Sequence, residues 1–541
     1  MAYVVAIVSA FLVLSAATAL RPSRHGLFAA FAYPVGWAAG ELPGKGIAVE
    51  AILLGALWWS GWPATTWLRV LVAVLASLVT LENLALIAIL FRSRTVVRRS
   101  MNDAPVQPLR IGRPRDDVFG RWWRTTLQIP FHPRAMELNA NIAYGPLERQ
   151  RLDIWKMPTT SDKAPVIYYI HGGAWTFGDK RQQGRPMLHE FVSRGWVVVA
   201  INYRLAPQFP WPAQIEDATR ALGWIKSHIS SYGGDPDRVV VAGGSAGGHL
   251  ASLLALSSED PTWRPAELHE LTDWSVRGAL SFYGVLEMFG DEEHWRGMGG
   301  ALRRLLEHRV VQLPYDGNDE IYRALSPLER IRVDSPPFFV VQGTTDTLVE
   351  VNVARSFVAK FRAIAFAPLY YIELPLTQHA FDLTVSPRTS ATTRAALAFA
   401  ESVAVPRPQL SRELIANYQV PPTSLQVYQR EEWVDVLDAV VDGEFFVVTS
   451  DNPYSRVLNG LDNENRRHEL REVLDARHIA YAEARGHDPG GTWPDELGVA
   501  LFEVTRDEAR ALALAWEQFA FYEVGAKGVL VRESTSDLVL S

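Results

Sequence analysis

Apolar residues are concentrated in about the first hundred positions of the chain. Residues 2–20 contain no charged side chain and are long enough to cross a bilayer as a helix. Residues 67–91 are also long enough but contain two charged side chains, whereas residues 46–62 are shorter and contain one. We therefore predict about three transmembrane helices within residues 1–99.

A fourth apolar stretch, residues 26–40, is interrupted by Pro34 and is too short to span a bilayer. We expect it to lie at the membrane interface or to form a re-entrant segment. A cleaved signal peptide is the alternative interpretation of the first stretch. No basic residue precedes that stretch, however, and further apolar segments follow it, which favours transmembrane helices.

Arginines follow both the first and the last predicted helix (Arg21, Arg24, Arg92, Arg94, Arg98 and Arg99). With three crossings, both groups lie on one side of the membrane, and clustered positive charge favours the cytoplasmic side. This predicts an integral protein of the plasma membrane whose remaining domains are cytoplasmic. A fourth crossing would place those domains outside.

The rest of the chain alternates apolar runs with amphipathic segments, which predicts an α/β fold with a mainly parallel, doubly wound sheet. Apolar side chains from Ile215 to Ile229, for example, recur at spacings of three and four and predict a helix. We expect this domain at residues 137–405, after a basic linker at residues 100–136. A small α+β domain is expected at residues 409–541.

Composition excludes several classes of protein. The chain has 541 residues, a formal net charge of −7 and no cysteine. The length predicts two or three domains, and the absence of a basic stripe argues against nucleic acid as a partner. Without cysteine there are no disulfides or thiolate-bound metals, and no metal-binding or dinucleotide motif occurs, so we expect neither a metal nor a cofactor.

The sequence Gly243-Gly244-Ser245-Ala246-Gly247 follows an apolar run and leads into a predicted helix. A serine on such a sharp strand-to-helix turn is exposed, and small neighbours are required where the backbone reverses. We predict that Ser245 is a nucleophile and that the backbone N–H of Ala246 contributes to an oxyanion hole.

A second glycine-rich segment, HGGAW at residues 171–175, follows another apolar run. A tetrahedral intermediate of acyl transfer needs preorganised N–H donors, and glycines let a loop approach the reacting oxygen closely. We predict that Gly173 and Ala174, with Gly172 as a further candidate, complete the oxyanion hole. His171 is expected to brace this loop rather than to act as a base.

The remaining members of a catalytic triad should follow the serine in the order acid, then histidine. Asp346 and His379 each follow a predicted strand, where an open α/β sheet places its ligands. We predict that Asp346 orients His379, which acts as general base and acid. The alternative is that Asp346 caps a helix and that His379 is an ordinary loop residue.

These motifs resemble the carboxylesterases of the hormone-sensitive-lipase type and the similar BD-FAE-like α/β-hydrolases over residues 139–403. The resemblance also rests on NYRLAP at residues 202–207 and YGGDP at residues 232–236. It implies the roles given above for Ser245, Asp346 and His379. Gly244 departs from the family pattern, because many relatives carry an acidic residue before the serine.

Residues 411–541 resemble the DUF3293 family of unknown function. The resemblance rests on TSDNP (449–453), NENRR (463–467), GHDP (486–489), WPDE (493–496) and EQFA (517–520). These polar residues either form a small binding site or cap turns.

The sequence thus predicts a membrane-anchored serine hydrolase that cleaves carboxylic esters through an acyl-enzyme. Its partners would be the bilayer and a small-molecule ester, lipid esters included, with Trp175 and Phe177 at the edge of the substrate pocket. We expect the triad to be built entirely within the central domain. The alternatives are an arylformamidase-like amidase and a catalytically inert membrane scaffold with a C-terminal binding module.

Overall fold

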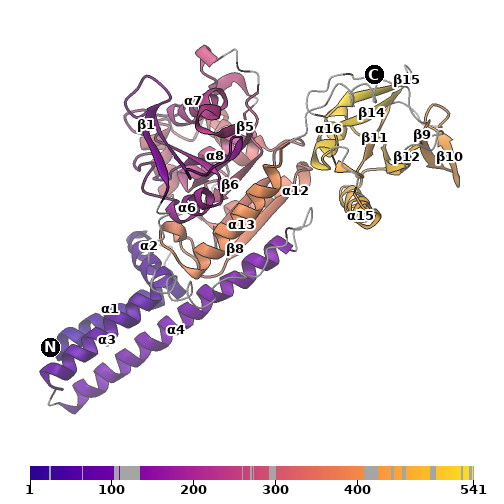
Figure 1. Cartoon of the computed structure of the whole chain (residues 1–541). Helices are drawn as coiled ribbons and strands as arrows, with labels where there is room; N and C mark the ends of the chain where they lie inside the picture. Colours follow the sequence, from indigo (N-terminus) through magenta and orange to yellow (C-terminus); the bar gives the residue numbers. More distant parts are fainter. Residues whose placement is uncertain are drawn as a thin grey trace.

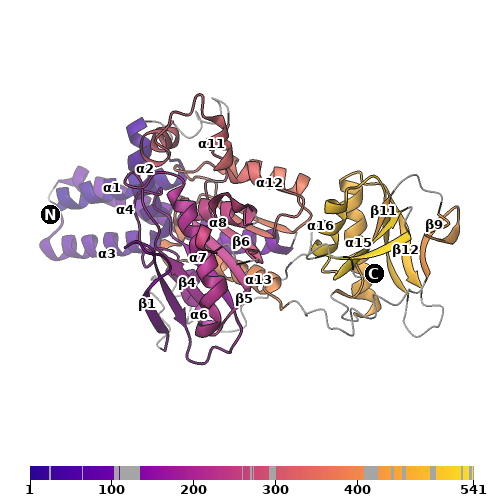
Figure 2. The ribbon, with the colours of Figure 1, turned by 90° about the horizontal axis from the view of Figure 1, so that it is seen from above.

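The molecule consists of a helical N-terminal region, a central α/β domain and a C-terminal β-rich domain (Figure 1). The computed structural model describes residues 1–22, 26–63, 65–102, 109, 135–258, 260–268, 271, 273–290, 300–406, 424–439, 444–453, 458–487, 495–525, 528–534 and 539. Most of the predicted linker at residues 100–136 lies outside these ranges. Seen from above, the C-terminal domain and the N-terminal helices lie at opposite ends of the central domain (Figure 2).

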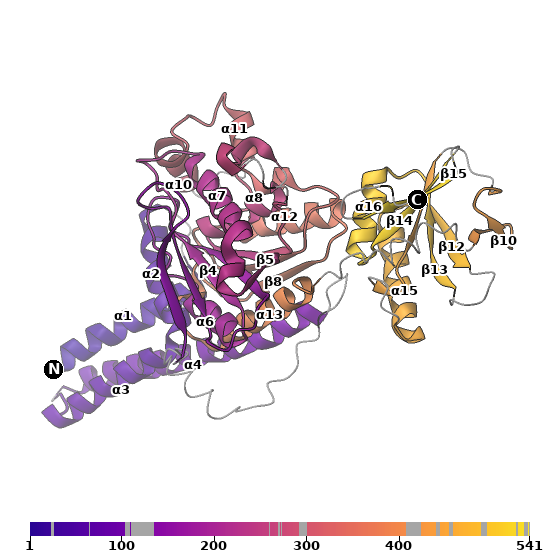
Figure 3. The same cartoon turned by 45° about the horizontal axis from the view of Figure 1, so that its top comes forward.

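The apolar N-terminal segments form helices, as their composition predicts. They are α1 (Ala2–Leu20), α2 (Gly26–Glu41), α3 (Pro43–Ser60) and α4 (Thr66–Asn102). Among the described residues, α1 and α4 are long and apolar enough to cross a membrane. A third span would combine Tyr33–Glu41 with Pro43–Ser60, which are bent by 85°. Because of this bend, α2 lies across the end of the bundle beside the central domain (Figure 3).

Helix α4 runs without a break from the N-terminal bundle to the central domain. Val72, near its start, packs with α1 and α3, whereas Val97 and Met101 near its end belong to a core of the central domain. On the bundle itself, large apolar side chains such as Ile7 (69% exposed) and Ile52 (70% exposed) face outward. An apolar outer surface suits a bilayer better than water.

The central domain is built on an 8-stranded sheet with the strand order β1-β2-β4-β3-β5-β6-β7-β8. Its strands are β1 (Glu137–Ala143), β2 (Arg151–Lys156), β3 (Ala164–Ile170), β4 (Val197–Ile201), β5 (Gly234–Gly244), β6 (Gly278–Phe282), β7 (Phe338–Gly343) and β8 (Leu369–Leu374). β2 pairs antiparallel with both β1 and β4 at one edge, and the other neighbours pair in parallel. The predicted α/β fold with a mainly parallel sheet is thus confirmed.

Helices cover both faces of this sheet. They are α6 (Arg185–Ser193), α7 (Ala213–His228), α8 (Ala246–Leu256), the short α10 (Ala301–Leu305) and α11 (Asp319–Ala324), α12 (Val351–Ile364) and α13 (Pro387–Val403). Alternate residues of β3 point to opposite faces: Val166 joins the core with α7, α8 and α12, and Ile167 joins the core with α6, α13 and α4. The second layer of helices therefore includes the end of α4.

The C-terminal domain has a 7-stranded antiparallel sheet of order β10-β9-β12-β13-β11-β14-β15. Its elements are β9 (Ser424–Gln429), β10 (Glu432–Asp435), β11 (Phe445–Thr449), α15 (Gly460–Ala476), β12 (Tyr481–His487), β13 (Glu496–Leu501), α16 (Arg506–Ala515), β14 (Ala520–Gly525) and β15 (Gly528–Glu533). This confirms a small α+β domain after the central one.

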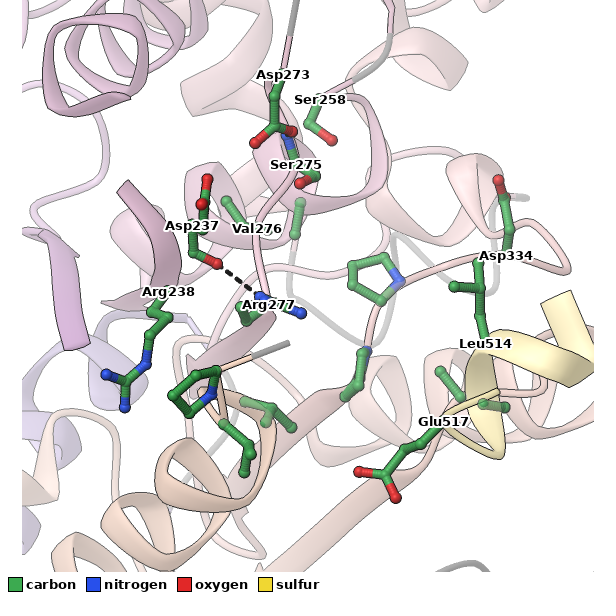
Figure 4. Close-up of a pocket in the computed structure, with 18 of the residues that line it drawn as sticks. Asp237, Arg238, Ser258, Asp273, Ser275, Val276, Arg277, Asp334, Leu514 and Glu517 are labelled. Carbon is green, nitrogen blue, oxygen red and sulfur yellow. Dashed lines mark hydrogen bonds between the residues drawn. The ribbon is translucent and has the colours of Figure 1, made fainter. Parts of the chain in front are cut away.

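A cavity of about 1450 Å³ lies between the central and C-terminal domains (Figure 4). Asp237 and Arg277, near the starts of β5 and β6, line one side, and Leu514 in α16 and Glu517 just after it line another. The Arg277 guanidinium donates to the Asp237 carbonyl oxygen at 2.6 Å. The cavity thus lies at the amino ends of the parallel strands, at the opposite edge from the predicted catalytic residues.

Candidate active site

Ser245 lies at the turn between β5 and α8, as predicted from the glycine-rich motif. Its φ of 56° and ψ of −123° form a strained backbone conformation that residues with a side chain rarely adopt. A Cβ at Gly243 would lie 2.2 Å from the carbonyl oxygen of Gly247, and a Cβ at Gly247 would lie 2.0 Å from that of Ile170. Only glycine therefore permits this turn, which presents Ser245 at the carboxyl end of β5.

The loop after β3 provides unused backbone donors near this serine. Gly173 has a φ of 118°, and a Cβ there would lie 2.0 Å from the carbonyl oxygen of Phe177, so the loop requires glycine. In the described part of the chain, the N–H groups of Gly173, Ala174 and Ala246 donate to no protein acceptor. Free N–H groups in this position suit an oxyanion.

Gly172 has a different role from the one predicted. A Cβ at this position would lie 3.1 Å from the Cβ of Ser245, so the loop lies directly against the serine. The N–H of Gly172, however, donates to the Gln183 side-chain oxygen at 2.8 Å. Gly172 therefore supplies room for the close approach, and its amide is not a free donor.

His171 braces the loop from below. It is fully buried, its Nδ1 lies 2.7 Å from the carbonyl oxygen of Gly172, and its ring stacks on Tyr203 with centroids 4.4 Å apart. Since a carbonyl oxygen only accepts, Nδ1 carries the proton. Burial lowers the pKa of His171 to about 4, so the ring is neutral at pH 7.

Asp346 and His379 are held together at the ends of β7 and β8. Nδ1 of His379 lies 2.7 Å from Oδ2 of Asp346, and both side chains are almost fully buried. The other carboxylate oxygen accepts the N–H groups of Leu348 and Val349, each at 2.9 Å. A carboxylate held in this way orients the imidazole and leaves Nε2 of the neutral ring unprotonated.

Tyr283 connects the serine turn with the histidine. It follows β6, and its ring centroid lies 4.6 Å from that of His379. A Cβ at Gly244 would lie 2.8 Å from its hydroxyl oxygen, which explains why an acidic residue is absent there. The hydroxyl donates to the buried carboxylate of Asp382. Burial raises the pKa of Tyr283 well above its usual value, so the hydroxyl keeps its proton. The sequence signal for Tyr283 was its place directly after a buried strand.

The two aromatic residues predicted at the pocket edge differ in exposure. Trp175 is 1% exposed, and its indole N–H donates to Nδ1 of His249 at 3.2 Å. Trp175 is therefore a core residue beneath the loop, where its ring has a buried polar partner. Contrary to the prediction, it does not lie at the edge of the substrate pocket. Phe177 is 62% exposed, and its place at the pocket edge stays a prediction.

Helix α2, which lies outside the central domain that carries the predicted triad, also reaches the histidine. The ring of Tyr33 lies 6.2 Å from that of His379, measured between centroids, at an interplanar angle of 69°. The indole N–H of Trp37 donates to the carbonyl oxygen of Ala380 at 3.0 Å. No local sequence motif predicts these contacts, because they join parts of the chain more than three hundred residues apart.

Polar residues of the C-terminal motifs gather at the end of β11. Arg467 donates to Oδ2 of Asp451 at 2.6 Å, and the side chain of Asn463 accepts the N–H of Asn452 at 3.0 Å. Arg466 donates to the carbonyl oxygen of Ser450 at 2.6 Å. These contacts tie α15 to the turn after β11. The motif residues 488–489 and 493–494 lie outside the described residues.

Comparison with known proteins gives two family matches. Residues 152–361 match the BD-FAE family, and residues 448–521 match a protein family of unknown function, DUF3293. Both matches confirm the resemblances indicated by the motifs.

Similar proteins occur in Mycobacterium tuberculosis (strain ATCC 25618 / H37Rv). The chain is 45% identical over 257 residues to the probable carboxylic ester hydrolase LipM, and this alignment covers 47% of this chain and 58% of LipM. It is 40% identical over 261 residues to the esterase LipQ, and this alignment covers 48% of this chain and 61% of LipQ. It is 37% identical over 277 residues to the esterase LipC, covering 51% of this chain and 67% of LipC. The chain thus spans about three fifths of the length of LipM and LipQ.

Proposed function

Because the chain belongs to the esterase family of α/β-hydrolases that includes LipC, we propose that it is a serine hydrolase that cleaves carboxylic esters at Ser245. His379 takes the proton from the Ser245 hydroxyl as the serine oxygen attacks the ester carbonyl. The N–H groups of Gly173, Ala174 and Ala246 stabilise the resulting oxyanion. His379 then gives its proton to the departing alcohol.

The second half of the reaction reverses these roles. Water loses a proton to His379 and attacks the acyl carbon, and the serine oxygen leaves with that proton as the acid is released. Asp346 holds the imidazole in the required tautomer and stabilises its charged form. The observation that carries the proposal is the 2.7 Å contact between Asp346 and His379, which follow β7 and β8 at the same end of the sheet as the strained Ser245 turn after β5.

The test is replacement of the nucleophile. Purified Ser245→Ala should lose turnover of p-nitrophenyl butyrate and should no longer be labelled by a fluorophosphonate. The matched control is Ser402→Ala, at the far end of α13, which should keep both. Unchanged turnover in Ser245→Ala would refute the proposed nucleophile, and an unlabelled wild-type enzyme would favour an inert scaffold.

A comparison of the turnover of N-formylkynurenine with that of butyrate esters distinguishes an amidase from an esterase. A higher kcat/KM for the formyl amide would overturn the ester assignment and leave the triad in place. The catalytic residues are common to both reactions, so only the substrate distinguishes them.

The N-terminal bundle is proposed to anchor the enzyme in a membrane. Its exposed apolar surface and the lengths of α1 and α4 support this. Exposed Arg98 and Arg99 lie on the part of α4 that packs on the central domain, which favours a cytoplasmic active site. Protease added to sealed, right-side-out cells should leave the central domain intact, and its digestion would refute this sidedness.

A further inference from the structure

Helix α2 is packed between the bundle and the loop that carries His379. On one side, a Cβ at Gly36 would lie 3.3 Å from the carbonyl oxygen of Thr18, so α2 is in close contact with α1. On the other side, Trp37 donates to the carbonyl oxygen of Ala380 at 3.0 Å. The helix therefore forms the boundary between the proposed membrane anchor and the catalytic histidine.

A buried ion pair fixes α2 in this place. Glu41 at the end of α2 pairs with Arg388 at the start of α13, and each side chain is 1% exposed. The same guanidinium donates to Ser93 in α4 at 3.3 Å and to the carbonyl oxygen of Pro375 at 3.3 Å. Ser386 donates to the second carboxylate oxygen of Glu41, also at 3.3 Å. Because both charges have several partners, the pair holds α2, α4 and the two ends of the histidine loop together.

Tyr33 projects from this fixed helix toward the reacting groups. It is half-buried, and its ring meets that of His379 nearly edge-on. An aromatic ring beside the histidine offers an apolar contact to whatever part of the substrate extends toward α2. On the bundle side of α2, the outer surfaces of α1 and α3 are apolar and exposed. Helix α2, which carries Tyr33, thus lies between the bundle with this apolar outer surface and the histidine.

We propose that α2 is the membrane-facing wall of the substrate site, and that the site takes esters with a long apolar chain that enter from the bilayer along this helix. In this arrangement Tyr33 is a specificity-determining residue that contacts the chain near the reacting carbonyl. The inference rests on the proposed function, since it requires Ser245 to be the nucleophile. It narrows the substrate class from esters in general to esters dissolved in a membrane.

The absence of cysteine from the chain permits a direct test. The full-length Tyr33→Cys enzyme carries a single thiol, and its Ser245 is first modified with a dodecyl or an ethyl fluorophosphonate. In this reaction the serine oxygen bonds to phosphorus, fluoride leaves, and His379 takes the hydroxyl proton. The rate of maleimide labelling is then measured. The matched control is Tyr3→Cys, at the far end of α1.

We expect the dodecyl adduct to slow labelling at position 33 at least tenfold, and the ethyl adduct to slow it less than twofold. Labelling at position 3 should be the same in all three states. Equal rates at position 33 with and without the dodecyl chain would overturn the proposal. An enzyme that forms no phosphonate adduct at all would instead refute the proposed function, so the two failures are distinguishable.

Substrate preference provides a second test of the proposal, which does not depend on the reactivity of the thiol at position 33. For each variant, the ratio of kcat/KM for p-nitrophenyl laurate to kcat/KM for p-nitrophenyl acetate is measured with vesicle-bound enzyme. Each rate is divided by the amount of fluorophosphonate-reactive enzyme. Tyr33→Ala should lower this ratio about tenfold, whereas Tyr3→Ala should leave it unchanged. A ratio for Tyr33→Ala within twofold of the wild-type value, or above it, would overturn the proposal.

Discussion

Tyr283 stands so close to Gly244 that a Cβ at position 244 would lie 2.8 Å from the tyrosine hydroxyl oxygen. Gly244 ends β5 and Tyr283 directly follows the neighbouring strand β6, and they meet beside the proposed nucleophile. The turn that carries Ser245 is therefore shaped by a residue that takes no part in proton transfer.

Gly244→Ala should lower both activity and stability. The added methyl group must displace a buried tyrosine that is itself bonded to Asp382, and overpacking of this kind costs about 1–3 kcal/mol. We expect at least a tenfold loss of kcat for p-nitrophenyl butyrate and a lower thermal midpoint. Gly460→Ala is the control, because no atom lies within 4 Å of a Cβ at that position. Wild-type kinetics in Gly244→Ala would show that the turn does not depend on this contact.

Asp346→Asn should reduce kcat by about 10³- to 10⁴-fold with little effect on folding. The amide cannot stabilise a charged imidazole, and its NH₂ group can force His379 into the wrong tautomer. Steady-state kinetics with a short-chain ester, together with circular dichroism, would measure this effect. Asp319→Asn, an exposed residue at the start of α11, should retain full activity. A loss of less than tenfold in Asp346→Asn would exclude Asp346 as the orienting acid.

Gly173→Ala should slow acylation about a hundredfold or more, because the new Cβ would lie 2.0 Å from a backbone oxygen and the oxyanion donors must shift. Gly195→Ala separates this effect from backbone strain. Gly195 also has a positive φ, of 82°, but nothing lies within 4 Å of its Cβ position. Pre-steady-state burst kinetics report acylation directly. A similar burst rate in both variants would contradict a role for the loop at position 173.

The thermal midpoint should fall as the pH decreases from about 6.5 to about 4. Burial lowers the pKa of His171 and that of His249 to about 4, below the ordinary value of 6.5. In this pH range the unfolded chain binds protons that the folded chain does not, so acidification favours unfolding by on the order of a few kcal/mol per ring. His249→Gln should flatten this dependence, since glutamine does not titrate, whereas His228→Gln, at an exposed position, should not. If the thermal midpoint of His249→Gln depends on pH as steeply as that of the wild type, the role of His249 in this pH dependence is refuted.

Glu41→Gln should destabilise the full-length protein by about 3–5 kcal/mol, because it leaves the buried Arg388 without its counter-charge. The double variant with Arg388→Met should recover much of this loss. Glu373→Gln is the control, because its partner Arg355 is 52% exposed and exposed pairs contribute about 1 kcal/mol or less. Thermal unfolding in detergent compares the four proteins. Equal midpoints for Glu41→Gln and Glu373→Gln would show that the buried pair does not hold the two parts together.

The positions of Ser245, Asp346 and His379 could be predicted because each lies in a short motif directly after a strand of a parallel sheet. In that architecture, local sequence determines which edge of the sheet a residue occupies. The surroundings of these residues could not be predicted in the same way. Trp175 belongs to the same loop motif as Gly173, yet its buried indole bonds to His249 in α8, more than seventy residues along the chain.

The N-terminal region shows the same division between local and long-range information. Residues 26–40 are too short for a span, and the structure has a helix there that is bent by 85° relative to α3. The side of α2 that meets His379 depends on contacts with the loop after β8, so no periodicity within residues 26–40 reveals it.

The length of α4 sets how the enzyme can search for substrate. A helix of 37 residues with a rise of about 1.5 Å per residue is a rod of about 55 Å, and both its ends are packed into folded parts of the molecule. In the proposed membrane setting, this rod keeps the catalytic groups at one height above the lipid and at one tilt. In that setting, encounters with membrane-dissolved substrate are confined to a two-dimensional layer.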